Sequence, residues 1–178
     1  SPFYKNGFVV ACGDSRDAIL IDPGDEVDDL IRIADAKRLP IGLILLTHAH
    51  VDHVSGVARA KRATGARIGV HGGDLFLYNA AVEQGRMFGY ALEPPPPPDF
   101  DLADGAPIRF GACEVHVHHT PGHSPGGVCL RVSAPGFAET HLFVGDTLFA
   151  GSIGRTDLPG GDYETLMRSI REVLFAFG

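Results

Sequence analysis

The chain has 178 residues, of which 44% are hydrophobic and 21% are charged, and its formal net charge is -7. This length and composition fit one globular domain over residues 1–178. The acidic charge argues against a nucleic-acid partner, and no apolar run approaches the roughly 20 residues that a membrane span needs, so we expect no membrane partner either.

The first half of the chain alternates short apolar runs with amphipathic segments, which predicts strands and helices in turn. Acidic residues at the start of the first helix suit the positive end of its dipole, and Gly65 is a typical helix stop. The predicted elements are a hairpin of strands 8–12 and 18–22, helix 25–37, strand 41–47, helix 54–64, strand 67–70 and helix 74–84.

A run of five prolines, Pro94 to Pro98, separates two halves at about 1–93 and 99–178. Five prolines in a row cannot join a helix or a central strand, so we expect a stiff, extended spacer. The second half is rich in predicted strands, at 107–110, 113–120, 127–133 and 140–144, and ends in a predicted helix over 162–177 with Asp162 as its N-cap.

Four side chains of metal-ligand type follow strand 41–47 directly: His48, His50, Asp52 and His53. A loop after a strand can direct all four into one pocket, because neither helix nor strand periodicity has to be kept there. Imidazoles with a carboxylate and without a neighbouring cysteine indicate a catalytic type of metal site, which suits zinc, iron or manganese.

Two further polar residues follow predicted strands: His123 in the stiff turn T-P-G-H-S-P-G, and Asp146 in the motif G-D-T. The pattern H-x-H-x-D-H, followed by these two motifs in this order, resembles the metallo-β-lactamase superfamily. The resemblance implies an α/β fold, a four-layer αββα sandwich, with a metal site at one edge.

The resemblance further implies two divalent ions, zinc before iron or manganese, with Asp52 and Asp146 as catalytic carboxylates. The implied ligands are His48, His50 and His123 for the first ion, Asp52 and His53 for the second, and Asp146 for both. Dinuclear members use one more histidine after the aspartate, and no histidine follows His141 here. We therefore expect the C-terminal end to be missing and the second ion to be underligated.

The segment from Leu148 to Asp162 looks like the glyoxalase II group, the hydroxyacylglutathione hydrolases, in their short bacterial forms. This implies hydrolysis of a small thioester, such as S-D-lactoylglutathione or another glutathione conjugate. The chemistry suits a metal-activated hydroxide, because a thiolate with a pKa of about 8.5 leaves with little help from a general acid.

Other activities remain open. Gly154-Arg155-Thr156-Asp157 is also similar to the persulfide dioxygenases of the same superfamily, which by resemblance would hold one iron at His48, His123 and Asp146. A lactonase, a β-lactamase and a metal-binding protein without turnover rank below these two.

Two residues near the site have two interpretations each. Asp22 ends its strand and is either an acceptor that orients a ligand histidine or the N-cap of the next helix. Arg155 is either an anchor for a substrate carboxylate or part of a salt bridge. We interpret His71, His116, His118 and His119 as structural.

The three cysteines, Cys12, Cys113 and Cys129, are widely spaced and form no C-x-x-C motif. We predict that each is a small, buried, unpaired side chain. An odd count without a pattern suggests a reducing compartment, so we expect a cytoplasmic protein.

Overall fold

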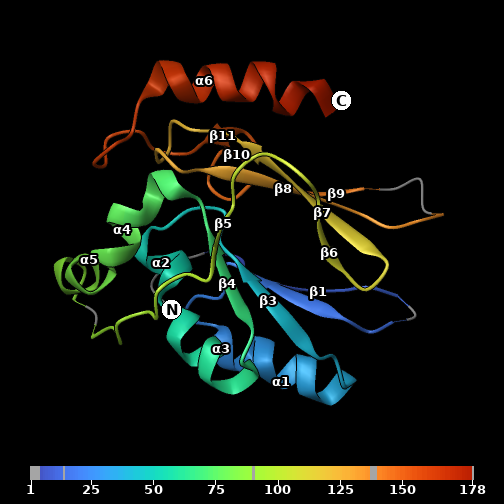
Figure 1. Cartoon of the computed structure of the whole chain (residues 1–178). Coiled ribbons are helices and arrows are strands. Elements are labelled where there is room, and N and C mark those ends of the chain that lie inside the picture. Colours follow the sequence, from blue (N-terminus) through green and yellow to red (C-terminus); the bar gives the residue numbers. More distant parts are fainter. Residues whose placement is uncertain (1–4, 14, 90, 137–139, 178) are drawn as a thin grey trace.

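The computed structural model describes residues 5–13, 15–89, 91–136 and 140–177. Two main sheets pack face to face, and helices cover both outer faces (Figure 1). The predicted α/β architecture, an αββα sandwich, is confirmed. Among the described residues, no helix combines the length and apolar character that crossing a bilayer requires.

The first sheet has, within the described residues, the order β1-β2-β3-β4-β5. Its strands are β1 (Phe8–Ala11), β2 (Ala18–Ile21), β3 (Ile41–Leu45), β4 (Arg67–Val70) and β5 (Phe100–Asp101). Only β1 and β2 pair antiparallel in this sheet. The carboxyl ends of β2, β3 and β4 therefore meet at one edge, where a site can form. Because β5 follows the proline run, the first sheet extends beyond the boundary expected between the halves.

The second sheet is an antiparallel meander in the described part of the chain. It comprises β6 (Ile108–Phe110), β7 (Cys113–His119), β8 (Val128–Ser133) and β9 (His141–Phe143). Helix α6 (Tyr163–Glu172) and the 3-10 turn η2 (Leu174–Phe177) lie over its outer face (Figure 1). The predicted N-cap is confirmed, because the Asp162 side chain accepts a hydrogen bond from Thr165 N.

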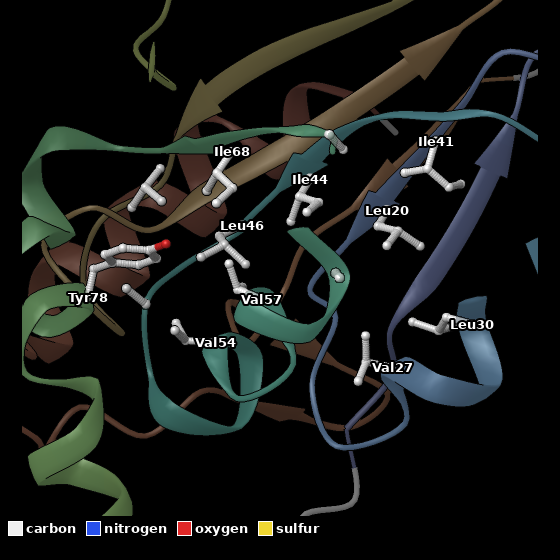
Figure 2. Close-up of a cluster of buried hydrophobic side chains, with 14 of the residues drawn as sticks. Leu20, Val27, Leu30, Ile41, Ile44, Leu46, Val54, Val57, Ile68 and Tyr78 are labelled. Carbon is white, nitrogen blue, oxygen red and sulfur yellow. The ribbon is translucent and has the colours of Figure 1, made fainter. Parts of the chain in front are cut away.

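Strand β2 is buried on both faces along its length, and β3 is so at Ile44 and Leu45, which explains their nearly continuous apolar sequences. One face packs against α1 (Val27–Lys37) and α3 (Val57–Thr64), and Figure 2 shows Leu20 and Ile44 in this layer. The other face, with Ile19 and Leu45, packs against the second sheet. This double burial fixes the position of the loop that follows β3.

Two predicted helices are interrupted. The first begins earlier than expected, as α2 (Val51–Val54), and α3 starts only after Ser55 and Gly56. At the break, Gly56 N donates to the carbonyl of Pro23, so the chain bends toward the end of β2. The second is divided into η1 (Gly72–Asp74), α4 (Leu75–Asn79) and α5 (Ala81–Met87). A small hairpin, β10 (Leu148–Phe149) with β11 (Ser152–Ile153), and strand β5 were not predicted.

Cys12 and Cys113 form a disulfide, so the prediction of unpaired cysteines is wrong for this pair. Cys12 follows β1 of the first sheet and Cys113 begins β7 of the second, and the two residues are 101 positions apart in sequence with Cα atoms 5.7 Å apart. Only the packing of the two sheets brings them together, and no local spacing signals such a pair. For Cys129 the prediction is confirmed, because it is buried and free.

We expect reduction of the Cys12–Cys113 bond to lower the free energy of unfolding by about 2–5 kcal/mol, because a cross-link across a long loop restricts the unfolded chain. The measurement is denaturant unfolding with and without a thiol reductant. The Cys129→Ala variant should respond to reductant as the wild type does, whereas Cys12→Ser should not respond. A wild type whose stability is the same in both conditions would contradict the cross-link.

Candidate metal centre

The loop after β3 carries the first two candidate ligands, His48 and His50, and both side chains are buried. The next two, Asp52 and His53, lie in the short helix α2 rather than in a loop, and this differs from the prediction. His50 has extended backbone geometry and forms the N-cap position of α2. The chain therefore turns from strand to helix within the motif, and both parts face the edge of the sandwich.

His48, His50 and His123 form one group of ligand-type side chains. His123 Nε2 lies 2.9 Å from His50 Nδ1 and 3.1 Å from His48 Nε2. Nitrogen atoms held at about 2.0–2.1 Å by one tetrahedral zinc ion would lie about 3.3 Å apart, so the three imidazoles fit a common ion.

Burial keeps two of these imidazoles neutral. It lowers the pKa of His48 well below its ordinary value and that of His50 to about 3, and the neighbouring imidazoles lower both further. His123 Nδ1 donates to the carbonyl oxygen of Arg155 at 2.7 Å, which leaves Nε2 as the acceptor nitrogen. Neutral rings with their lone pairs turned toward one point are what a metal ion requires.

His48, His53 and Asp146 form a second group that shares His48 with the first. His53 Nε2 lies 3.4 Å from Asp146 Oδ1 and 3.6 Å from Asp52 Oδ2, and it is buried without a hydrogen-bond partner among the described residues. The other oxygen of Asp146, Oδ2, lies 3.8 Å from His123 Nε2. Asp146 Oδ1 thus faces the second group and Asp146 Oδ2 faces the first. The side chains of the two groups together suit two ions.

Opposite charges dominate the second group. Burial alone would lower the pKa of His53, but the carboxylates of Asp22, Asp146 and Asp52 outweigh it and raise this pKa to about 10. Burial would raise the pKa of Asp146, but His53 outweighs that effect and lowers it. An ion held by His53 would therefore have to displace a proton, and its binding would release that proton.

A glycine allows Asp146 to approach the first loop. Gly145 has φ of 52°, a left-handed conformation that favours glycine, and a side chain there would collide with Thr47. Asp146 is consequently carried to the edge of the first sheet, although it follows β9 of the second sheet.

Asp22 lies behind the candidate ligand His53 and is not a helix N-cap, since Glu26 occupies the N-cap position of α1. Its carboxylate accepts hydrogen bonds from Thr47 N at 2.7 Å and from Thr47 Oγ1 at 2.6 Å, and its Oδ2 is 3.0 Å from His53 Nδ1. Asp22 therefore makes the contacts expected of an acceptor that orients a candidate ligand histidine.

Arg155 makes a two-pronged salt bridge with Asp157, at 2.7 Å for each contact, and both side chains are exposed. Arg155 contacts the candidate site through its backbone oxygen, which accepts the hydrogen bond from His123 Nδ1. His71 and His119 stack on each other, with ring centroids 4.2 Å apart, and belong to neither ligand group. His116 and His118 alternate with the buried valines Val115 and Val117 of β7 and so face the opposite side of the sheet, as predicted, where His118 contacts Phe177.

A cavity of about 590 Å³ opens beside the second group. Asp52, His53 and Asp146 contribute to its polar wall together with Lys5 and other polar residues, and Phe8, Phe143 and Phe149 contribute to its apolar lining. Sequence reasoning missed these aromatic residues, because they come from both sheets and from the β10–β11 hairpin. It also missed Asp74, although the motif V-H-G-G-D ends β4 just as the histidine motif ends β3.

Residues 1–176 match the family model described as the metallo-beta-lactamase superfamily. A hydroxyacylglutathione hydrolase, GloC of Haemophilus influenzae, is 37% identical over 166 residues, which cover 90% of this chain and 75% of that protein.

Solved structures are similar over nearly the whole chain. The crystal structure of TTHA1623 in a di-iron-bound form has 40% sequence identity and a TM-score of 0.84, and it covers 98% of this chain and 83% of its own. The B3 metallo-beta-lactamase BLEG-1 has 33% identity and a TM-score of 0.87, and it covers 100% of this chain and 84% of its own.

Proposed function

The chain belongs to the metallo-β-lactamase superfamily, and from this premise we propose that it is a metal-dependent thioester hydrolase of the glyoxalase II type, a hydroxyacylglutathione hydrolase. The observation that carries the proposal is the pair of ligand groups, with one oxygen of Asp146 turned toward each. The relative of that name in Haemophilus influenzae supports the thioester as the substrate class.

The proposed ligands are His48, His50 and His123 for one ion, Asp52 and His53 for the other, and Asp146 for both. We propose zinc, although the same imidazoles and carboxylates accept iron or manganese, and the similar TTHA1623 structure is of a di-iron-bound form. When bound, such ions supply a hydroxide near neutral pH and polarise a carbonyl oxygen.

In the proposed reaction, apolar residues of the cavity orient the substrate and two carboxylates position the attacking group. Phe8, Phe143 and Phe149 provide apolar surface for the acyl group next to the polar wall of the cavity. Asp52 and Asp146, the proposed catalytic carboxylates, fix the position of the attacking group at that wall. The leaving thiolate, with a pKa of about 8.5, needs no strong proton donor. Arg155 is held by Asp157, so we do not retain it as a substrate anchor.

The test is hydrolysis of S-D-lactoylglutathione by the full chain, measured as thiol release, before and after metal removal with a chelator. We expect activity that chelation abolishes and zinc, iron or manganese restores. A metal-loaded protein without thiol release would refute the thioester hydrolase.

A persulfide dioxygenase is the second candidate, because Gly154 to Asp157 adjoin the site through the bond from His123 to the Arg155 carbonyl. Oxygen consumption with glutathione persulfide and one iron per chain would support it. Hydrolysis of a lactone or a cephalosporin would support the lower-ranked activities, and metal binding without any turnover would support a binding protein.

The proposed partner is thus a small thioester and neither a nucleic acid nor a membrane. We propose the cytoplasm as its location, because acylated thiols form where low-molecular-weight thiols are kept reduced. The Cys12–Cys113 disulfide weighs against this location, because disulfides are rare where soluble thiols are kept reduced.

A further inference from the structure

Asp74 connects the two loops that carry the first ligand group. The side chain belongs to η1, just after β4, and is fully buried with 0% exposure. Its Oδ2 accepts hydrogen bonds from Ala49 N at 2.9 Å and from Ser124 Oγ at 2.8 Å, and its Oδ1 accepts one from Gly126 N at 2.6 Å. Ala49 lies between His48 and His50, and Ser124 follows His123 in sequence.

These two loops come from different sheets. The first follows β3 of the first sheet, and the second follows β7 of the second sheet. The geometry of the three imidazoles therefore depends on what holds the two sheets in register at this edge. A backbone bond from Val128 N to Thr47 O, at 2.8 Å, joins them at the base of the loops, and Asp74 joins them beside the histidines.

The close approach of Asp74 is built into the second loop. A Cβ atom at Gly126 would lie 2.8 Å from Asp74 Cβ, so only glycine leaves room for the carboxylate at this position. A buried carboxylate without donors would cost several kcal/mol, and here three donors satisfy it. A buried carboxylate that accepts hydrogen bonds from two loops is expected to hold those loops together.

We propose that Asp74 is a positioning residue of the metal centre, which fixes the separation of the His48–His50 loop and the His123 loop and thereby raises the affinity for the first ion. The inference rests on the proposed metal centre but not on the proposed substrate. Asp74 itself belongs to neither ligand group, and it would act through the backbone and side-chain groups that flank the proposed ligands.

The substitution Asp74→Asn keeps the volume and removes one acceptor oxygen. The amide oxygen can serve either Ala49 and Ser124 or Gly126, and the amide nitrogen then faces a donor on the other side. We expect the affinity for zinc to fall by about 10- to 100-fold, as for other partners that orient metal ligands. Ser124→Ala, which removes one bond of the three, should give a smaller loss.

The control is Asp99→Asn. Asp99 also accepts a bond from a backbone N–H, that of Ile68 at 2.7 Å, and contacts neither metal loop, but unlike Asp74 it is exposed and paired with Lys61. The measurement is zinc affinity by competition with a chromogenic chelator, together with the unfolding temperature of the metal-free protein. Neither readout needs turnover, so failure of the hydrolase leaves this test intact.

A loss of affinity in Asp74→Asn, with wild-type affinity in Asp99→Asn, would support the proposal. An Asp74→Asn protein that is less stable when metal-free but binds zinc as the wild type does would overturn it, because Asp74 would then serve stability alone. If Asp74→Asn does not fold, Ser124→Ala decides, and unchanged affinity in that variant overturns the proposal. A wild type that binds no zinc would overturn the metal centre itself.

Discussion

The His48→Ala variant is expected to lose metal and activity together. His48 is a proposed ligand of the first ion and also lies within the second group, so its removal takes a ligand from one ion and alters the surroundings of the other. Loss of several kcal/mol of Lewis-acid stabilisation, at about 1.4 kcal/mol per tenfold, corresponds to a fall in kcat/KM of about a thousandfold or more. Metal content by elemental analysis should fall in parallel with thiol release from S-D-lactoylglutathione.

The matched control for this variant is His116→Ala. His116 is a half-buried histidine on the outer side of β7, and it contacts Glu114 rather than any candidate ligand. We expect wild-type metal content and activity in His116→Ala. Full activity in His48→Ala would refute the ligand set, whereas an equal loss in both variants would point to damage to the fold instead of the site.

The Asp146→Ala variant is expected to lose one ion and most of the activity. The three imidazoles of the first group remain, so one ion should still bind, but the carboxylate that faces both groups is gone. Since the two ions act together on the nucleophile and the carbonyl, we expect a fall in kcat/KM of about a hundredfold to a thousandfold. The pKa of His53 should also fall, because Asp146 raises it.

Metal stoichiometry and the titration of His53 by NMR in the metal-free protein measure these effects. Asp157→Asn is the control, since Asp157 is an exposed carboxylate that pairs with Arg155 and touches neither group. An Asp146→Ala protein with full activity would show that the aspartate does not serve the reaction.

The strands were predictable where burial requires a continuous run of apolar residues in the sequence. Residues 18–21 are apolar and buried throughout, and residues 43–45 are apolar where β3 is covered on both faces, whereas Gly42 is exposed. Polar residues in the loops that follow strands, such as His48 after β3 and His123 after β7, indicate the edge of the sandwich where they gather. The order of the three motifs then predicted the αββα fold through resemblance.

Features that depend on packing between the sheets could not be predicted. The Cys12–Cys113 bond joins the two sheets and leaves no mark in local spacing. The contacts of Asp74 with Ala49 and Ser124 likewise span 25 and 50 positions. The break between α2 and α3 was missed because the apolar periodicity continues across Gly56, and only the contact with Pro23 shows why the helix stops.

The central claim is that side chains distant in sequence converge to hold metal ions. A crystal structure of the zinc-loaded full chain, with anomalous scattering recorded at the zinc edge, tests it most directly. We predict a zinc peak at about 2.0–2.1 Å from nitrogen atoms of His48, His50 and His123, and a second, weaker peak beside His53 and Asp146. Zinc bound elsewhere, or no peak among these three histidines, would contradict the account.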